Sequence, residues 1–467
     1  MSDFFKHGFH PSILRAYDIR GIIGETLTTD DAFAIGAGFA HILGGKGKKI
    51  AVGYDGRLSS PELAEALING LMASGAEVLQ TGLGPTPQLY YADILHDCDG
   101  AIQITGSHNP PNYNGFKMVR GHASFFADDI TSLGALMAKG ITLTHDGSQQ
   151  KVPVADAYIS RLLDDVDCTD DIFVWDTGNG AAGPSVRALI SQMTGTHHLL
   201  FEEVDGTFPN HHPDPVDPHT LGFLRDACKT HDALAGLGFD GDGDRLGMID
   251  GKGRQVPGDI LTAFLAQDFL QSNPGETILF DVKSSISAMK LVEQAGGKAE
   301  LWKTGHSHMK AKMKETGCQL AGEMSGHIFI GDGYFGYDDA LYVAVRTLRA
   351  MKQNNQTITE FMDSLPASHT TPECRVPCDD DVKFSVMAGL ADYAKSEFQN
   401  CEVIVIDGIR VQDENGWWLI RASNTEACLV ARAEGMSEAA LAKKMTELES
   451  CLATQAIDWK FANKDDQ

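Results

Sequence analysis

The chain has 467 residues, of which 43% are hydrophobic and 22% are charged, as in ordinary globular proteins. Its net charge of −26 argues against a nucleic-acid-binding protein, because phosphate backbones attract basic surfaces. No apolar run is long enough for a signal peptide or a membrane span, and the nine cysteines show no paired metal motif. We therefore expect a cytoplasmic protein that binds neither nucleic acid nor membrane.

One strand–turn–helix pattern occurs three times along the chain. Buried strands are predicted at 49–55, 172–178 and 278–283, followed by apolar-periodic helices at 61–74, 184–193 and 285–295. Further along each copy, a second strand runs into a polar loop, at 101–110, 233–244 and 320–327. The carboxyl ends of strands face the ligand crevice in open α/β sheets, so these loops are the predicted active-site segments.

The last hundred residues follow a different plan. Strand-like runs at 401–408 and 417–423 and a helix at 437–452 predict a smaller α+β domain. The predicted fold class is therefore α/β, with three similar α/β domains with mixed sheets and a C-terminal α+β domain. The predicted domains are 1–152, 153–254, 255–366 and 367–467, divided where turn residues interrupt the periodic segments.

The most informative segment carries Asp240, Asp242 and Asp244. The spacing i, i+2, i+4 directs three carboxylates to one side, and the intervening glycines let the backbone curl around them. Oxygen ligands favour Mg²⁺ or Ca²⁺ over zinc. An EF-hand fails on spacing, since positions 245 and 251 are Arg and Gly where that loop requires Gly and Glu. A solvated acidic turn is the alternative, although Arg245 adds a cation suited to phosphate.

Three other loops offer chemistry that each motif alone leaves open. Ser107 follows a buried strand and is either a nucleophile or part of a turn; it lacks the flanking glycines of a serine-hydrolase elbow. Glu323 and Ser325 lie on the same side if extended, so they either bind adjacent sugar hydroxyls or form a plain polar loop. The third loop offers hydrogen-bond donors suited to a phosphate group, although a capping turn is the competing interpretation. These donors come from Arg421, Ser423, Asn424 and Thr425.

Taken together and in this order, the four loops resemble those of the α-D-phosphohexomutases, specifically the bacterial phosphomannomutase/phosphoglucomutase group. The matching motifs are Thr-Gly-Ser-His-Asn-Pro at 105–110, Asp-Gly-Asp-Gly-Asp-Arg at 240–245, Gly-Glu-Met-Ser-Gly-His at 322–327 and Arg-Ala-Ser-Asn-Thr at 421–425, with support from 15–21, 114–117 and 303–306. The resemblance implies four domains around a central cleft, each contributing one loop. It also implies an isomerase that transfers a phosphoryl group between C1 and C6 of mannose and glucose phosphates.

The resemblance further implies a role for each site residue. Ser107 is expected to be a phosphoserine that forms a 1,6-bisphosphate intermediate, with Mg²⁺ held by the three aspartates and the serine phosphoryl group. Glucose 1,6-bisphosphate is the expected activator, and the protein is expected to be a monomer or weak dimer. Positive charge and proton transfer at the reacting group are assigned to Arg20, Lys117, Arg245 and His306; sugar binding to Lys283, Glu323, Ser325 and His327; and phosphate binding to the 421–425 loop with Tyr17.

Two other activities remain compatible with these motifs. A phosphoglucosamine mutase is the nearest alternative, but members of that group usually have Gln or a similar residue where this chain has Met324. A metal-dependent sugar phosphatase could use the acid triplet and Ser107, but it does not need a second phosphate site at 421–425.

Overall fold

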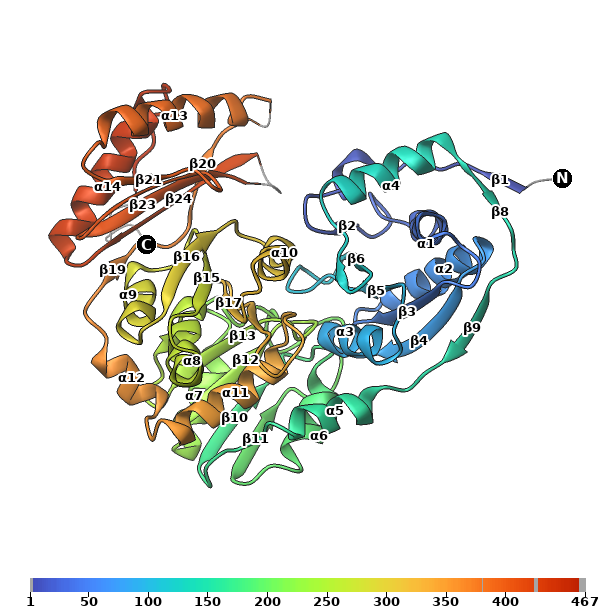
Figure 1. The fold of residues 1–467 in the computed structure, drawn as a ribbon, viewed down its shortest axis with the longest axis horizontal. Coiled ribbons are helices and arrows are strands. Elements are labelled where there is room, and N and C mark those ends of the chain that lie inside the picture. The colour runs from blue at the N-terminus through green and yellow to red at the C-terminus, as the bar shows by residue number, and fades with distance from the viewer. Residues whose placement is uncertain (1–2, 380, 424–426, 462–467) are drawn as a thin grey trace.

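The computed structural model describes residues 3–379, 381–423 and 427–461. Figure 1 shows the chain following an arc, from the N-terminal sheet through two further sheets to the C-terminal domain. Three sheets combine parallel and antiparallel strands and the fourth is antiparallel, so the predicted fold class is confirmed. No helix in the described part of the chain combines the length and the apolar character that crossing a membrane requires.

The first sheet and its helices occupy the N-terminal part of the chain. Its strand order is β2 (Ile19–Ile22), β6 (Tyr113–Arg120), β5 (Gly100–Ile104), β3 (Lys49–Tyr54), β4 (Glu77–Leu83) and β9 (Ser148–Lys151), with β7 (Ala123–Ser124) beside β6. The helices are α1 (Thr29–Leu43), α2 (Ser60–Ala73), α3 (Thr86–Leu95) and α4 (Asp128–Lys139), with a short 3₁₀ turn at Pro11–Ile13. A separate two-stranded ribbon pairs β1 (Asp3–Phe5) with β8 (Ile141–Leu143).

The second and third sheets lie in the middle of the chain. The second has the order β11 (Thr196–Leu200), β10 (Ile172–Asp176), β12 (Ala235–Phe239), β13 (Leu246–Asp250) and β14 (Gln255–Val256), and its helices are α5 (Ala155–Leu163), α6 (Gly183–Ile190) and α7 (Gly222–His231). The third has the order β16 (Lys298–Trp302), β15 (Thr277–Asp281), β17 (Leu320–Gly322) and β18 (Ile328–Ile330). Its helices are α8 (Gly258–Ser272), α9 (Ile286–Gln294), α10 (His306–Thr316), α11 (Ala340–Gln353) and α12 (Ile358–Ser364).

These three sheets share one core arrangement. In each, three neighbouring strands are parallel and the next one is antiparallel: β4-β3-β5 with β6, β11-β10-β12 with β13, and β16-β15-β17 with β18. Strands β5 and β12 are buried along their whole length, as expected for strands covered on both faces. The three predicted site loops occupy equivalent positions, namely the turn between the last parallel strand and its antiparallel neighbour.

The C-terminal domain is antiparallel throughout. Its sheet has the order β19 (His369–Thr370), β24 (Cys428–Gly435), β23 (Gly416–Ala422), β22 (Ile409–Asp413) and β21 (Glu402–Ile404), and β20 (Cys374–Pro377) also pairs with β24. Helices α13 (Lys383–Glu397) and α14 (Glu438–Ala453) pack on the sheet. The predicted α+β character of this domain is confirmed.

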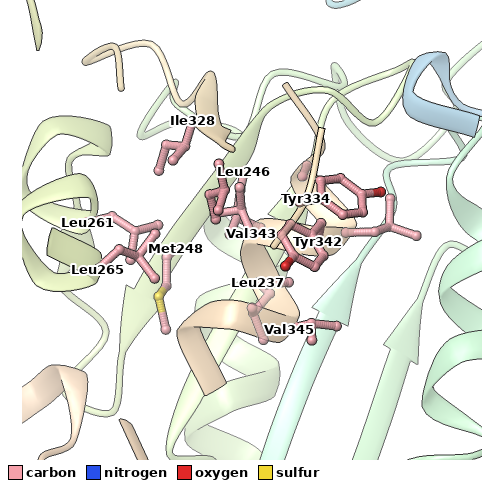
Figure 2. Close-up of a cluster of buried hydrophobic side chains, with 14 of the residues drawn as sticks. Leu237, Leu246, Met248, Leu261, Leu265, Ile328, Tyr334, Tyr342, Val343 and Val345 are labelled. Carbon is pink, nitrogen blue, oxygen red and sulfur yellow. The ribbon is translucent and has the colours of Figure 1, made fainter. Parts of the chain in front are cut away.

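The middle domains are joined by a shared apolar core. Figure 2 shows Leu237, Leu246 and Met248 of the second sheet lying against side chains of α8 and α11, which belong to the third. The same buried cluster also includes residues of the first domain, whereas the C-terminal domain has its own core. Burial of each large aliphatic side chain contributes about 1.5–3 kcal/mol, so this shared core holds the first three site loops in fixed relative positions.

Candidate functional site

Ser107 lies in the turn between β5 and β6 and points toward the second domain. Its side chain is buried, and its φ of 49° lies in the left-handed region that residues other than glycine seldom adopt. The Ser107 Oγ donates a hydrogen bond to Oδ2 of Asp240 at 2.7 Å and lies 3.2 Å from Nδ1 of His108. The predicted nucleophile therefore contacts the acid triplet directly.

The acid triplet lies in the turn between β12 and β13. Asp240, Asp242 and Asp244 are fully buried, and one oxygen from each lies within 4.8 Å of the others. The Nζ of Lys117, from β6, donates to Oδ2 of Asp242 at 2.7 Å and also to Oδ2 of Asp244. The two domains thus bring three acids, one ammonium and the serine hydroxyl to one place.

The electrostatics of this cluster fit a bound divalent cation. Burial raises the pKa of Asp240 well above its ordinary value, and repulsion from Asp242 and Asp244 adds to the rise. For Asp242 the effect of burial is outweighed by the Lys117 ammonium, which lowers the pKa of that carboxyl. Oδ1 of Asp242 and Oδ1 of Asp244 are buried without a hydrogen-bond partner among the described residues. The Lys117 ammonium and the nearby Arg245 guanidinium are two cations for three carboxylates, and the oxygens without a partner are the donors that a hard divalent cation takes.

The loop between β17 and β18 brings a carboxylate and a hydroxyl together. Oε1 of Glu323 accepts a hydrogen bond from the Gly305 amide at 2.8 Å, and Oε2 accepts one from Oγ of Ser325 at 3.0 Å. Glu323 is buried, and burial raises its pKa. This pair offers an acceptor and a donor side by side, which is the chemistry required to bind adjacent hydroxyl groups.

His327 links the acid loop to the third domain. Its Nε2 accepts a hydrogen bond from Nε of Arg245 at 2.9 Å, so the ring proton lies on Nδ1, which is 3.0 Å from Oδ2 of Asp338. His306 stacks on His327 with ring centroids 5.4 Å apart, and its Nδ1 lies 3.7 Å from the same carboxylate oxygen. Burial and the positive charge of Lys310 lower the pKa of His306 well below its ordinary value. His306 is therefore neutral near pH 7.

The predicted phosphate loop lies at the end of β23. Arg421 donates to Oδ1 of Asp407 at 3.3 Å and lies 3.1 Å from its Oδ2, and it is hydrogen-bonded to the hydroxyl of Tyr17 from the first domain. The Ser423 carbonyl accepts a hydrogen bond from Nζ of the buried Lys383 at 2.7 Å. The other two predicted members of this loop, Asn424 and Thr425, lie outside the described residues.

A closed series of contacts connects the four loops. Ser107 joins the first domain to the second, and the Arg245–His327 bond joins the second to the third. Asp407 accepts from the Thr304 amide at 3.1 Å, which joins the third domain to the fourth, and the Arg421–Tyr17 bond returns to the first. The site predicted from four separate motifs is therefore one continuous constellation.

Two predicted residues lie at its margins. Arg20, on β2, donates to Asp18 at 2.6 Å, and its positive charge adds to the effect of burial in lowering the pKa of His108. Lys283 follows β15, and its Nζ lies 3.2 Å from Oε1 of Glu373.

Sequence reasoning did not identify Thr86, Asp338 or His108. Thr86, at the start of α3, donates from Oγ1 to Oδ2 of Asp242 at 2.5 Å and from its amide to the Asp242 carbonyl at 2.8 Å. Asp338 precedes α11 and accepts from Lys310 at 2.8 Å. For His108 the signal was its place next to Ser107; the other two residues lie in no site motif.

Comparison with known proteins identifies the family. Residues 11–140, 156–253 and 257–369 match the phosphoglucomutase/phosphomannomutase alpha/beta/alpha domains I, II and III, and residues 373–449 match the C-terminal domain. The chain belongs to the phosphoglucomutase/phosphomannomutase family. The resemblance drawn from the four motifs is thus confirmed.

Relatives of this family member match nearly the whole chain. A phosphomannomutase/phosphoglucomutase of Pseudomonas putida is 44% identical over 433 residues, which cover 92% of this chain and 93% of that protein. A phosphoglucomutase of Neisseria gonorrhoeae is 42% identical over 436 residues, 92% and 94% of the two chains. The crystal structure of a family protein from Burkholderia thailandensis has a TM-score of 0.89 and 40% identity, covering 96% of this chain and 98% of that one.

Proposed function

We propose that this chain interconverts the 1-phosphates and 6-phosphates of glucose and mannose, as a phosphomannomutase/phosphoglucomutase. The observation that carries the proposal is the hydrogen bond from Ser107 Oγ to Asp240, which places a buried nucleophile against an acid cluster that lacks charge balance. Relatives at 44% and 42% identity with the names phosphomannomutase/phosphoglucomutase and phosphoglucomutase support the substrate class.

In the proposed reaction Ser107 carries the phosphoryl group. The P–O bond to Ser107 Oγ breaks as a bond forms to the free hydroxyl of a hexose monophosphate, giving a hexose 1,6-bisphosphate. After the bisphosphate reorients, the reverse transfer returns its other phosphoryl group to Ser107. Mg²⁺ held by Asp240, Asp242 and Asp244 would supply positive charge beside the phosphoryl oxygens. Arg20, Lys117 and Arg245 add to that charge.

The remaining residues bind and orient the sugar. We assign transfer of the hydroxyl proton to His306, since this ring is neutral and lies beside Asp338. Lys117, in contrast, donates to two aspartates whose negative charges keep it protonated. Glu323 and Ser325 hold the hydroxyls at C3 and C4, which lie between the two phosphates in either orientation. The phosphate that is not reacting binds Tyr17, Arg421, Ser423, Asn424 and Thr425. Lys283 and His327 complete the set of residues that bind the sugar.

A coupled assay tests this proposal. Glucose 1-phosphate and mannose 1-phosphate are each supplied with Mg²⁺ and a catalytic amount of glucose 1,6-bisphosphate, the proposed activator, and formation of the 6-phosphates is measured. Intact-mass measurement then reports whether Ser107 carries a phosphoryl group. Release of inorganic phosphate without isomer would instead indicate a phosphatase, and faster turnover of glucosamine 1-phosphate would indicate a phosphoglucosamine mutase.

Three further elements belong to the same proposal. The enzyme acts in the cytoplasm and is a monomer or weak dimer. Light scattering after gel filtration measures this oligomeric state. The proposed domain limits are those predicted from the sequence, at residues 152, 254 and 366, and β14 extends the second sheet just past the second limit. The four domains surround a central cleft that receives the hexose phosphate.

A further inference from the structure

The loop that carries Ser107 rests on a single buried guanidinium. Arg57 follows β3 and is 1% exposed. Its NH1 donates to the carbonyls of Pro110 and Tyr113 at 2.6 and 3.0 Å, and its NH2 donates to those of Ser107 and Asn109 at 2.7 and 2.6 Å. One planar side chain therefore fixes four carbonyl groups of the same loop.

Asp55 holds Arg57 and the other side of the loop. Its Oδ2 accepts hydrogen bonds from the hydroxyl of Thr105 at 2.8 Å and from the amide of Gly106 at 3.1 Å, and it lies 3.2 Å from Nε of Arg57. Its Oδ1 accepts from the Arg57 amide and from the Ser60 hydroxyl. The acid neutralises the buried guanidinium and orients the two residues that precede Ser107.

The conformation of the loop requires such support. Ser107 has a positive φ, which costs free energy unless the surroundings hold it. A Cβ at Gly106 would lie 2.4 Å from Cζ of Arg57, so the backbone lies directly against the guanidinium. Because the carbonyl of Ser107 is turned toward Arg57 while its Oγ faces Asp240, the negative end of that peptide points away from the reacting oxygen.

The second domain covers the other face of the guanidinium. The ring of Phe208 lies 5.2 Å from Cζ of Arg57, and a Cβ at Gly206 would lie 2.6 Å from Cα of Arg57. Arg57 therefore lies between the serine loop and a segment of the domain that supplies the acid triplet. Its position is sensitive to how the two domains fit together.

We propose that Arg57 and Asp55 are positioning residues that hold Ser107 in the geometry required for phosphoryl transfer. Both side chains are buried and bond to the backbone of the loop, so they act on Ser107 through that backbone. The inference rests on the proposed role of Ser107 as the phosphoryl carrier. It requires that loss of the guanidinium lowers kcat and leaves substrate binding by the other loops unchanged.

Three variants test this proposal. Arg57→Met keeps the length of the side chain and removes its donors; we expect a loss of about 100-fold in kcat, the cost of displacing a reacting group by about 1 Å. Arg57→Lys keeps the charge, but its ammonium cannot reach four carbonyls, so its kcat should lie between those of Arg57→Met and the wild type. Asp55→Asn removes the charge that orients Arg57 and replaces one accepting oxygen with a donating amide, and it should also lower kcat. KM for glucose 1-phosphate should stay within about threefold in all three variants.

The matched control is Arg346→Met. Arg346 is also a buried arginine, and it donates to the Asp332 carbonyl and the Tyr342 hydroxyl away from the four loops. This control should lower the melting temperature while keeping kcat. The lifetime of phosphorylated Ser107, followed by intact mass, should shorten in Arg57→Met and stay as in the wild type in Arg346→Met.

The outcomes separate the inference from the function on which it rests. An inactive wild-type protein would remove the proposed function itself. If the wild type is active and Arg57→Met folds but keeps the wild-type kcat, only the positioning role is overturned. The same holds if Arg346→Met loses as much kcat as Arg57→Met. If Arg57→Met does not fold, the isosteric Asp55→Asn decides, and wild-type kcat in that variant overturns the inference.

Discussion

Thr86 is expected to govern the affinity of the acid loop for its metal. Its hydroxyl donates to Oδ2 of Asp242 and its amide donates to the carbonyl of the same residue, so two bonds fix one ligand. Substitution Thr86→Val removes the hydroxyl and keeps the shape of the side chain. Because the hydroxyl contributes nothing to the sugar or phosphate loops, the change isolates the metal site.

The size of the effect follows from the environment of this bond. Thr86 and Asp242 are both fully buried, so no water replaces the lost donor. A hydrogen bond to a charged group contributes about 1.5–3 kcal/mol, and loss of such support behind a metal ligand weakens binding about 10- to 100-fold. We therefore expect the Kd for Mg²⁺ to rise by that factor, while the Asp242 backbone stays held by the Thr86 amide.

Isothermal titration with Mg²⁺ measures this Kd without reference to turnover. The control is Thr347→Val, since Thr347 is fully buried and its hydroxyl donates to the Val343 carbonyl within α11. The control should bind Mg²⁺ as the wild type does. An unchanged or tighter Kd in Thr86→Val would refute the reasoning, because it would show that Asp242 needs no support from the Thr86 hydroxyl beyond the bonds from the Thr86 amide and Lys117.

Other consequences of the site are also measurable. Ser107→Ala should abolish turnover while calorimetry still detects binding of glucose 1-phosphate; measurable isomer formation by this variant would contradict the carrier role. Arg421→Met should raise KM about 10- to 100-fold and lower kcat less, because it removes charge-assisted bonds to the distant phosphate, and an unaltered KM would exclude that contact. Burial raises the pKa of Asp339 to about 6 from its ordinary 3.8. The contribution of Asp339 to the free energy of unfolding is thus complete below about pH 4. It falls by about 3 kcal/mol as pH rises from about 4 through 6, at 1.36 kcal/mol per pKa unit. Urea unfolding of wild type and Asp339→Asn should show their difference shrinking over this range; a difference independent of pH would show that Asp339 is ionised throughout.

The repeated strands and the four site loops could be predicted from the sequence. Segments such as 172–178 read as strands because they are short, apolar and bounded by turn residues, and β10 spans Ile172–Asp176. The acids at 240, 242 and 244 could be grouped because alternate positions in one short segment share a side. These inferences depend on neighbours in the chain, which the sequence displays directly.

The residues that orient the site could not be predicted in this way. Thr86 and Asp242 are 156 positions apart, and Arg57 lies 50 positions from the serine whose carbonyl it binds. Asp338 meets His327 only because β18 and the segment before α11 fold back on each other. Such contacts arise from the fold within a domain, as for Arg57 and Asp338, or from the packing of two domains, as for Thr86, and no local spacing signals them. Lys117 was predicted near the reacting group, but its two bonds within the acid triplet come from the structure alone.

The four domains are held together in two different ways, and this difference bears on how the site works. The first three share one apolar core, so the Ser107, acid and sugar loops keep a fixed arrangement. The fourth meets the third through a small cluster of Val282, Ile286, Trp417 and Leu419 and through polar contacts such as Asp407 with the Thr304 amide. Polar contacts exchange partners at little net cost, because each broken bond is replaced by another. Arg421 already binds the Asp407 carboxylate and the Tyr17 hydroxyl, so the proposed substrate phosphate would compete with these two partners. We therefore expect the loop of the fourth domain to change its contacts as substrate enters, and the proposed reacting groups to stay on the three domains that share one core.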